Sequence, residues 1–247
     1  MDKVIFVAMS GARENMLAQQ THANNLANVS TTGFKTDLAQ ARAMQVFGEG
    51  LPSRVYAMTE RPATDTTTGT FIQTGRTLDV AVDGGGWLAV IAPDGNEAYT
   101  RSGELQLNAA NQLVTGSGLP VMGNGGIPIA VPEAEQVEIG SDGTITIRPA
   151  GESAAELAVV DRIKMVNLDQ QSIYKGLDGL MHVDANAAQP ADLNLKMRSG
   201  YLESSNVNAV NELTSIISLS RQFEMNIKMM KTAEENSSAA TQILSLS

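Results

Sequence analysis

The sequence predicts an α+β fold in which a long helix at each end of the chain flanks a β-rich middle. All 8 prolines lie between Pro52 and Pro190, and residues 201–247 contain neither glycine nor proline. The first 32 residues contain one glycine, Gly11, and no proline. Because glycine and proline are the residues that most disfavour helix interiors, both ends can form long helices. Long helices gain most of their stability by packing an apolar face, so assembly with other helices is the first hypothesis.

In the N-terminal segment, apolar residues recur at alternating steps of four and three, a heptad seam that places one side of a helix against a partner. The seam has one polar member, Gln19. An ordinary amphipathic helix packed on its own domain would show the same spacing. The helix is expected to end near Asn28, because residues 30–33 supply turn chemistry. The apolar members of the seam are Ile5, Met9, Ala12, Met16, Ala23 and Leu26.

The C-terminal segment repeats this pattern over a greater length. Asn208 is placed to cap a helix that runs to about Leu246. Without a partner such a helix would expose its whole apolar stripe to water. A helix lying on a membrane surface is the alternative, but the polar face carries Glu212, Glu224 and further acidic residues instead of many Lys or Arg. The seam consists of Ile216, Leu219, Phe223, Asn226, Met230, Ala233, Ser237, Ala240 and Leu244, widened by Ile217, Ile227 and Ile243.

The middle of the chain contains two regions that differ in composition and in hydrophobic pattern. Residues 36–77 are rich in Thr, Ala and Arg without clear periodicity, which indicates an extended linker. Residues 78–199 alternate short apolar runs with Asp-Gly and other turns, which is typical of a compact β domain. Residues 1–35 and 200–247 then form the terminal helical domain. The expected strands are 78–82, 87–91, 98–101, 104–107, 112–115, 127–131, 137–139, 144–147, 157–167 and 181–183.

Composition limits the possible partners and chemistry. The net charge is −10 and most of the acidic excess lies between the helices, which argues against a nucleic-acid partner. The absence of cysteine excludes disulfides, thiolate metal sites and cysteine nucleophiles. No stretch approaches the ~20 apolar residues of a membrane span. The N-terminus lacks the apolar region and cleavage site of a secretory signal, so we expect a cytoplasmic protein or export without signal cleavage.

Candidate sites for chemistry are weak. His22 and His182 stand alone, without a second ligand at metal spacing. Carboxylates such as Glu97 and Glu104, or Asp79 with Asp83, could serve a glycosidase, but a chain with 27 acidic residues contains such pairs by chance. We therefore expect no catalytic residue, no cofactor and no metal site.

The most specific string is residues 23–35, Ala-Asn-Asn-Leu-Ala-Asn-Val-Ser-Thr-Thr-Gly-Phe-Lys. It resembles the N-terminal signature of the bacterial flagellar rod and hook family: Asn-Asn-Leu-Ala-Asn, a short spacer with Thr, then Gly and an aromatic residue. Residues 98–103 resemble the family's central β domain, and residues 200–208 and 221–225 its C-terminal region. The opening residues, the strand at 86–90 and the chain length are most similar to the proximal rod members.

This resemblance implies a structural, non-enzymatic subunit of the proximal rod. Its terminal helices would pack with copies of itself and with other rod proteins into an inter-subunit coiled-coil layer, the inner tube of a drive shaft that transmits torque and encloses the export channel. The β domain would lie outside, and the linker would bridge neighbours. Export would use the flagellar type III apparatus, which delivers subunits to the periplasmic rod without signal cleavage. The expected interface residues are Ile5, Met9, Ala12, Met16, Ala23, Asn24, Asn25, Leu26, Asn28, Gly33, Phe34, Ile216, Leu219, Phe223, Ile227, Met230, Ala233 and Leu244.

Three alternatives stay open at this point. A distal rod member of the same family would share most of these features. A peptidoglycan-acting enzyme would need a carboxylate pair in a cleft. A free coiled-coil adhesin would form stable oligomers in solution.

Overall fold

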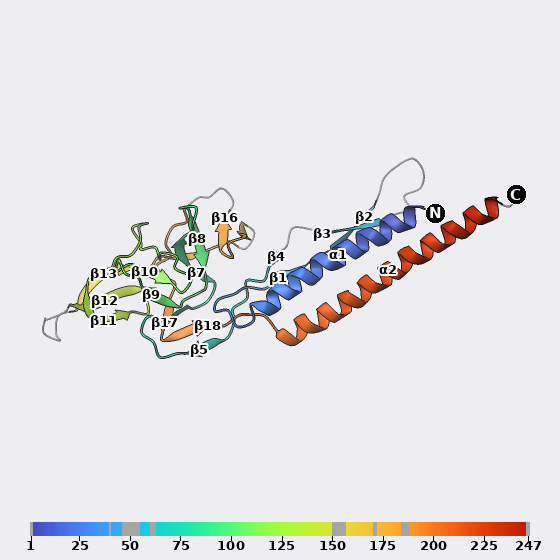
Figure 1. The fold of residues 1–247 in the computed structure, drawn as a ribbon. Coiled ribbons are helices and arrows are strands. Elements are labelled where there is room, and N and C mark those ends of the chain that lie inside the picture. Colours follow the sequence, from blue (N-terminus) through green and yellow to red (C-terminus); the bar gives the residue numbers. More distant parts are fainter. Residues whose placement is uncertain are drawn as a thin grey trace. The chain divides into compact units, whose positions relative to one another are not determined.

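The computed structural model of the chain has one long helix at each end and many short strands between them (Figure 1). It describes residues 2–39, 41–45, 55–59, 63–149, 157–169, 172–183 and 188–245. The helices are α1 (Asp2–Ala27) and α2 (Ala209–Ser245). The expected α+β class, with terminal helices and a β-rich middle, is confirmed.

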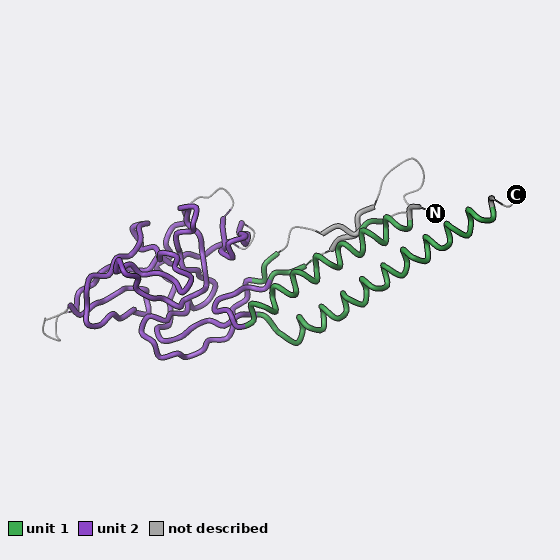
Figure 2. Tube along the Cα trace, viewed as in Figure 1, with its two compact units in different colours: residues 1–29, 37–65, 207–247 green, residues 30–36, 66–206 purple. Residues whose placement is uncertain are grey.

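The chain forms two compact units, coloured separately in Figure 2. The helical unit contains Met1–Val29, Asp37–Asp65 and Val207–Ser247. The β-rich unit contains Ser30–Thr36 and Thr66–Asn206. The chain therefore passes from one unit to the other after residues 29, 36, 65 and 206. The domain boundaries expected from the sequence stay predictions.

In the helical unit, α1 and α2 pack against each other as an antiparallel hairpin. The predicted cap of α2 is confirmed, because Asn208 Oδ1 accepts hydrogen bonds from the backbone N–H groups of Val210 (3.1 Å) and Asn211 (3.2 Å). Two antiparallel strand pairs accompany the helices. β1 (Asp37–Leu38) pairs with β4 (Ala63–Thr64), and β2 (Ala41–Gln45) pairs with β3 (Val55–Thr59), which lies against α1.

The β-rich unit consists of short antiparallel strands in small sheets. The largest sheet has the order β14-β7-β8-β16-β15, and a second sheet has the order β11-β12-β13. Two-stranded pairs complete the unit: β10 with β9, β17 with β6 and β18 with β5. The strands are β5 (Phe71–Gln73), β6 (Val80–Val82), β7 (Gly86–Ile91), β8 (Glu97–Thr100), β9 (Leu105–Leu107), β10 (Leu113–Thr115), β11 (Ala134–Ile139), β12 (Thr144–Pro149), β13 (Ala158–Arg162), β14 (Met165–Asn167), β15 (Ile173–Lys175), β16 (Met181–Val183), β17 (Met197–Ser199) and β18 (Tyr201–Glu203).

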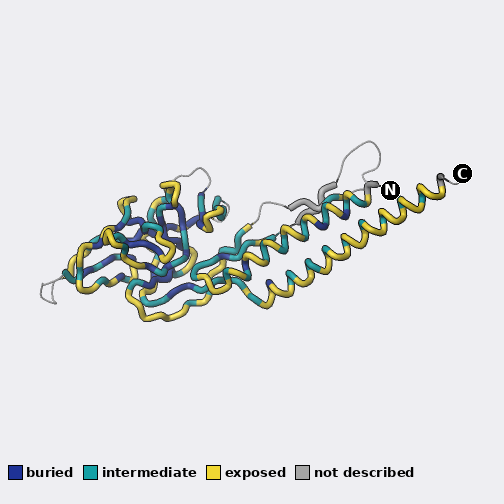
Figure 3. Tube along the Cα trace, in the orientation of Figure 1, coloured by how far each residue is buried: buried dark blue, intermediate teal, exposed yellow. Residues whose placement is uncertain are grey.

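The core of this unit is a cluster of buried aliphatic side chains from several of these sheets, shown in dark blue in Figure 3. Its largest fully buried members are Leu88, Leu105, Leu113, Ile129, Ile145 and Ile163, together with Met165 and Met197. Trp87 and Tyr99 belong to a second buried cluster. Burial of this kind is the main source of stability for a chain with few aromatic residues.

Two expected strands differ from the structure. Residues 127–131 form two isolated bridges instead of a continuous ladder, because Pro128 pairs with Met122 whereas Ala130 pairs with Gln112. Residues 157–167 divide into β13 and β14, with a break at residues 163–164. The predicted linker, residues 36–77, contains β1 to β5 where it is described. Its role as a bridge between subunits stays a prediction.

Candidate functional site

The predicted seam of α2 lies on the side of that helix that faces α1. Phe223, Met230 and Ala233 are half-buried, and so are the seam residues Ile216 and Leu219. A Cβ atom placed on Gly11 of α1 would lie 3.3 Å from Nδ2 of the seam residue Asn226. The absence of a side chain at Gly11 thus lets the two helices approach closely. The α2 seam therefore packs against α1 of the same chain.

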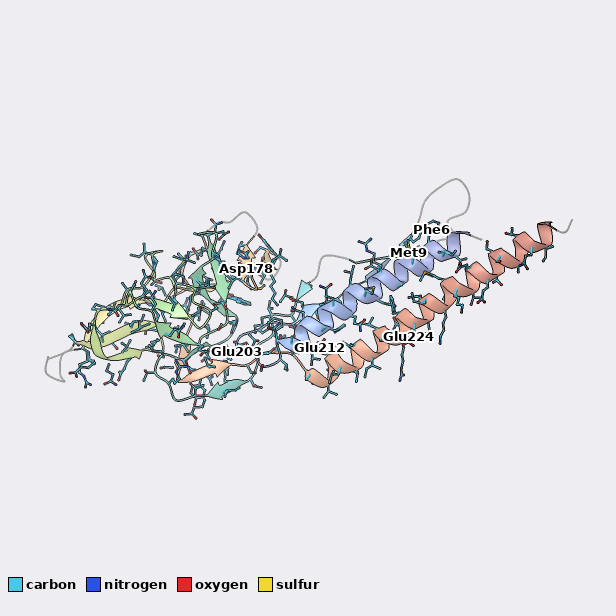
Figure 4. All side chains as sticks on the ribbon, in the orientation of Figure 1. Phe6, Met9, Asp178, Glu203, Glu212 and Glu224 are labelled. Carbon is cyan, nitrogen blue, oxygen red and sulfur yellow. The ribbon has the colours of Figure 1, made fainter. Side chains whose placement is uncertain are left out.

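The predicted seam of α1 is divided between two faces. Ala8 and Ala12 are buried in the hairpin, and the small size of alanine permits close packing there. The predicted members Met9 and Met16 are 53% and 58% exposed, so they point away from the hairpin core. Figure 4 labels Met9 beside Phe6, which is also exposed. Of the remaining members, Ile5 and Leu26 are half-buried and Ala23 is exposed.

Large apolar side chains remain exposed along both helices. Figure 3 shows all exposed residues of the helices, polar ones included, in yellow. Contiguous apolar patches on folded proteins commonly mark sites of contact with a partner, so this surface is the candidate interface. The predicted interface residue Ile227 belongs to this surface, whereas the side chain of Leu244 lies outside the described residues. We call this surface the apolar stripe; its members are Val4, Phe6, Met9, Met16, Leu17, Val210, Leu213, Ile217, Met225, Ile227, Met229 and Ile243.

Two grooves of the helical unit adjoin the apolar stripe. The larger, about 560 Å³, is lined by Leu17, Leu38 and Leu219 together with several polar side chains. The smaller, about 390 Å³, lies between Val4 and the stretch of α2 that contains Met229. Side chains of a partner helix commonly fill apolar grooves of this kind.

The Asn-Asn-Leu-Ala-Asn string at residues 24–28, which we call the asparagine signature, lies at the end of the hairpin. Asn25 is fully buried, donates a hydrogen bond to the carbonyl oxygen of Asp37 (2.8 Å) and accepts one from its N–H (3.0 Å). Asn28 donates a side-chain hydrogen bond to the carbonyl of Asn24, which is itself exposed. The end of α1 is thereby joined to the segment that leads into β1.

His22 and Glu212 also lie at this end of the hairpin. His22 Nδ1 of α1 is 2.5 Å from Glu212 Oε2 at the start of α2. Glu212 is labelled in Figure 4. A carboxylate in the first turn of a helix is also favoured by the helix dipole. This contact links the two helices by a side-chain pair that the sequence pattern did not reveal.

The β-rich unit contains a buried charge cluster that sequence reasoning missed. Glu203 is fully buried, and its carboxylate accepts hydrogen bonds from Lys35 Nζ (2.6 Å), Arg101 Nη1 (2.9 Å) and the N–H of Gly69 (2.9 Å). Burial lowers the pKa of Arg101, and the carboxylate of Glu203 opposes that change. Each charged member comes from one of the three strings that carry the family resemblance. The position of these three charged residues within those strings could have marked them as candidates. Nothing in their spacing along the sequence predicted that they contact one another.

Gly33 and Phe34, both predicted as interface residues, pack within the β-rich unit. Gly33 has a φ of 68°, and a Cβ there would lie 2.3 Å from the carbonyl carbon of Arg101, so only glycine fits. Lys175 Nζ lies 3.8 Å from the centre of the Phe34 ring, a cation–π contact. Whether either residue also contacts a neighbouring subunit stays a prediction.

The residues weighed for chemistry have ordinary partners. Glu97 forms an ion pair with Lys164 (2.7 Å), and Asp79 lies 3.6 Å from Arg76. His182 contacts Asp178 at 3.0 Å. Within the described residues, no three histidine, aspartate or glutamate side chains converge as in a metal site. In the same part of the chain, neither helix is long and apolar enough to cross a membrane.

Three family models match the chain. The model described as "Flagella basal body rod protein" matches residues 5–35, which include the asparagine signature. The "Flagellar hook protein FlgE/F/G D1 domain" matches residues 81–147 in the β-rich unit. The "Flagellar basal body rod FlgEFG protein C-terminal" model matches residues 198–243, mainly α2. The three matches therefore fall on the three regions in which the sequence resembles the family.

Full-length relatives agree with these models. The chain is 40% identical to the flagellar basal-body rod protein FlgF of Escherichia coli strain K12 and to that of Salmonella typhimurium strain LT2, over 100% of both chains in each case. It is 32% identical to the rod protein FlgG of Agrobacterium fabrum strain C58, over 96% of this chain and 99% of the relative. These relatives are named as rod proteins and not as enzymes. The predicted similarity to the proximal rod member of the family, FlgF, is confirmed, and the chain belongs to the family of flagellar basal-body rod proteins.

Proposed function

We propose that this chain is a structural subunit of the proximal rod, and that it assembles through its helical hairpin into a coiled-coil layer between subunits. The observation that carries the assembly mechanism is the apolar stripe, which lies on a hairpin whose inner face is already packed. A helix with a second apolar face needs a second partner. Neighbouring hairpins supply one, because each presents the same kind of surface.

The predicted seams then have two separate uses. The α2 seam, with residues such as Phe223 and Met230, holds the hairpin together. The exposed members Met9, Met16 and Ile227 are left to contact neighbouring subunits. The two grooves beside the stripe would receive side chains from those neighbours.

The wider role follows from membership of the rod family. The partners are copies of this chain and other rod proteins, and the assembled helices form the shaft that transmits torque around the export channel. Subunits reach the periplasm through the flagellar type III apparatus. A place in the proximal rod is favoured over the distal rod by the 40% identity to FlgF proteins against 32% to a FlgG protein.

The first test is mass spectrometry of hook–basal bodies purified from the source organism and washed with detergent. Peptides of this chain at a level comparable to other rod components are expected. Recovery of the chain only as free protein, with none in the basal bodies of motile cells, would overturn the proposal.

The second test separates assembly from folding. Met9→Asp and Met16→Asp each place a charge on a residue that is already largely exposed in the single chain, so the hairpin is expected to fold. The same charge between packed helices is costly, so incorporation into basal bodies should be lost. Gln20→Asp, an exposed polar position on the same helix, is the matched control and should incorporate normally. Normal incorporation of both methionine variants would show that the apolar stripe is not the interface.

A further inference from the structure

The chain passes between the two units at four places. At each of them, the part that belongs to the β-rich unit is one of three short segments. Residues 30–36 provide two of these passages, residues 66–70 follow a third, and residues 200–206 precede the fourth. Any force that reaches the β-rich unit along the chain must therefore enter through these segments. The contacts among them decide how that force is shared.

Glu203, which belongs to the third segment, forms hydrogen bonds with the other two. Its carboxylate accepts hydrogen bonds from Lys35 Nζ of the first segment and from the N–H of Gly69 in the second. Its carbonyl oxygen accepts a hydrogen bond from the N–H of Gly33 (2.8 Å). Lys35 Nζ also donates to the carbonyl of Thr67 (2.7 Å). Because Lys35 and Glu203 are both buried, water cannot readily replace these bonds.

Asn206 connects the same three segments where the chain leaves the unit. Its side-chain oxygen accepts hydrogen bonds from the N–H (2.8 Å) and hydroxyl (2.7 Å) of Thr36. Its side-chain amide donates to the carbonyl (3.2 Å) and hydroxyl (3.3 Å) of Thr67, and its own N–H donates to the carbonyl of Phe34 (3.4 Å). One side chain thus contacts the last residue of the first segment and the beginning of the second.

We infer that one group of residues resists the force that enters the β-rich unit along the chain. We call this group the clasp; it consists of Lys35, Thr36, Thr67, Gly69, Glu203 and Asn206. Its hydrogen bonds join segments that carry the chain in and out, so a pull on one segment is resisted by several bonds loaded together. Bonds loaded in parallel must break cooperatively, which slows opening more than the same bonds broken one after another. The inference rests on the proposed function only in taking torque as the load.

The decisive experiment pulls the full-length chain by its two termini in optical tweezers. Once the helices have been drawn apart, force enters the β-rich unit at residues 30 and 206 and loads the clasp directly. Asn206→Ala removes four side-chain hydrogen bonds from the clasp without burying a charge. At constant force we expect the β-rich unit to open roughly 50 times faster than in the wild type, since each of these four bonds contributes on the order of RT.

The matched control is Asn108→Ala. Asn108 also uses its side chain in hydrogen bonds, to Ala110 and Gln112, but it lies in a turn far along the chain from the passages. Its opening rate is expected to stay within about twofold of the wild type. If Asn206→Ala opens no faster than the wild type, or if Asn108→Ala opens equally fast, the clasp does not bear the load.

If Asn206→Ala fails to fold, a milder variant can be used in the same pulling experiment. Thr36→Val keeps the shape of the side chain and removes only its hydroxyl donor, so a rise in opening rate of about threefold is expected. An unchanged rate in this variant would also count against the clasp.

A measurement in cells connects the clasp to rotation. Motors with Asn206→Ala are expected to turn normally when a small bead is attached and to fail more often than Asn108→Ala motors under a large bead. Absence of the wild-type chain from basal bodies would refute the proposed function while leaving the pulling result intact. Equal performance of the two variants under high load would refute the clasp as a torque-bearing element while leaving the proposed function intact.

Discussion

Glu203→Gln is the substitution that tests the buried charge cluster most directly. The glutamine has nearly the same shape, but it removes the buried negative charge that the ammonium of Lys35 and the guanidinium of Arg101 both contact. Both cations are at most 3% exposed, so water cannot compensate them. Removing one partner of a buried ion pair costs about 3–5 kcal/mol, a large part of the roughly 5–15 kcal/mol by which a domain is stable.

The assay is urea unfolding of the full-length protein followed by tryptophan fluorescence. The chain has 1 tryptophan, and Trp87 is buried in the β-rich unit with the Arg101 guanidinium 5.3 Å from its ring centre. The signal therefore reports this unit alone. With a urea dependence of about 2 kcal/mol per molar, the unfolding midpoint should fall by about 1.5–2.5 M.

The control for this prediction is Glu104→Gln. Glu104 is 46% exposed on its side chain and lies 3.6 Å from Arg76, so this surface pair should contribute at most about 1 kcal/mol. Adding Lys35→Met to Glu203→Gln removes one of the two buried cations that have lost this carboxylate and should restore part of the lost stability. A midpoint for Glu203→Gln that equals the Glu104→Gln midpoint would refute the reasoning.

Three further predictions concern single contacts. Asn25→Ala removes two hydrogen bonds from a fully buried side chain and should cost the helical unit about 1–3 kcal/mol, measured by circular dichroism during urea unfolding; an unchanged transition would contradict this role. Gly33→Ala should destabilise the β-rich unit by more than about 2 kcal/mol, because its Cβ would overlap the backbone of Arg101, and increased proteolysis would reveal it. Hydrogen bonds from Thr144 lower the pKa of Asp142 below 3.8, so their stabilisation is present at neutral pH and lost as the pH falls through the lowered pKa. The stability difference between the wild type and Asp142→Ala should therefore shrink with acidification, and a difference independent of pH would disprove this account.

Much of the helical unit could be predicted from local sequence. The distribution of glycine and proline marked both helices, and Asn208 identified the start of α2, because capping depends on residues only two or three positions away. Hairpins such as β11–β12 were also predictable, since the Asp142–Gly143 turn fixes the pairing of its neighbours. The continuous strand expected at residues 127–131 was wrong, because this segment pairs in turn with two different partners, which local sequence does not reveal.

The two faces of α1 could not be separated in this way. Residues 4–9 are mostly apolar, so periodicity identifies a helix that buries more than one side but does not say which partner each side meets. Packing against α2 selects Ala8 and Ala12 and leaves Met9 and Met16 exposed. That division depends on the position of a helix about 200 residues away in the chain.

The sequence by itself determined the fold class, the extents of the helices, the family and thus the structural role. These depend on local preference and on strings that stay together along the chain. Only the tertiary structure decided which apolar residues stay exposed on the hairpin and which charges meet. Lys35, Arg101 and Glu203 are widely separated in sequence, and their contact is set by the strands and turns that bury them. A buried charge is tolerated only where its partners are brought to it, and that meeting depends on the whole fold.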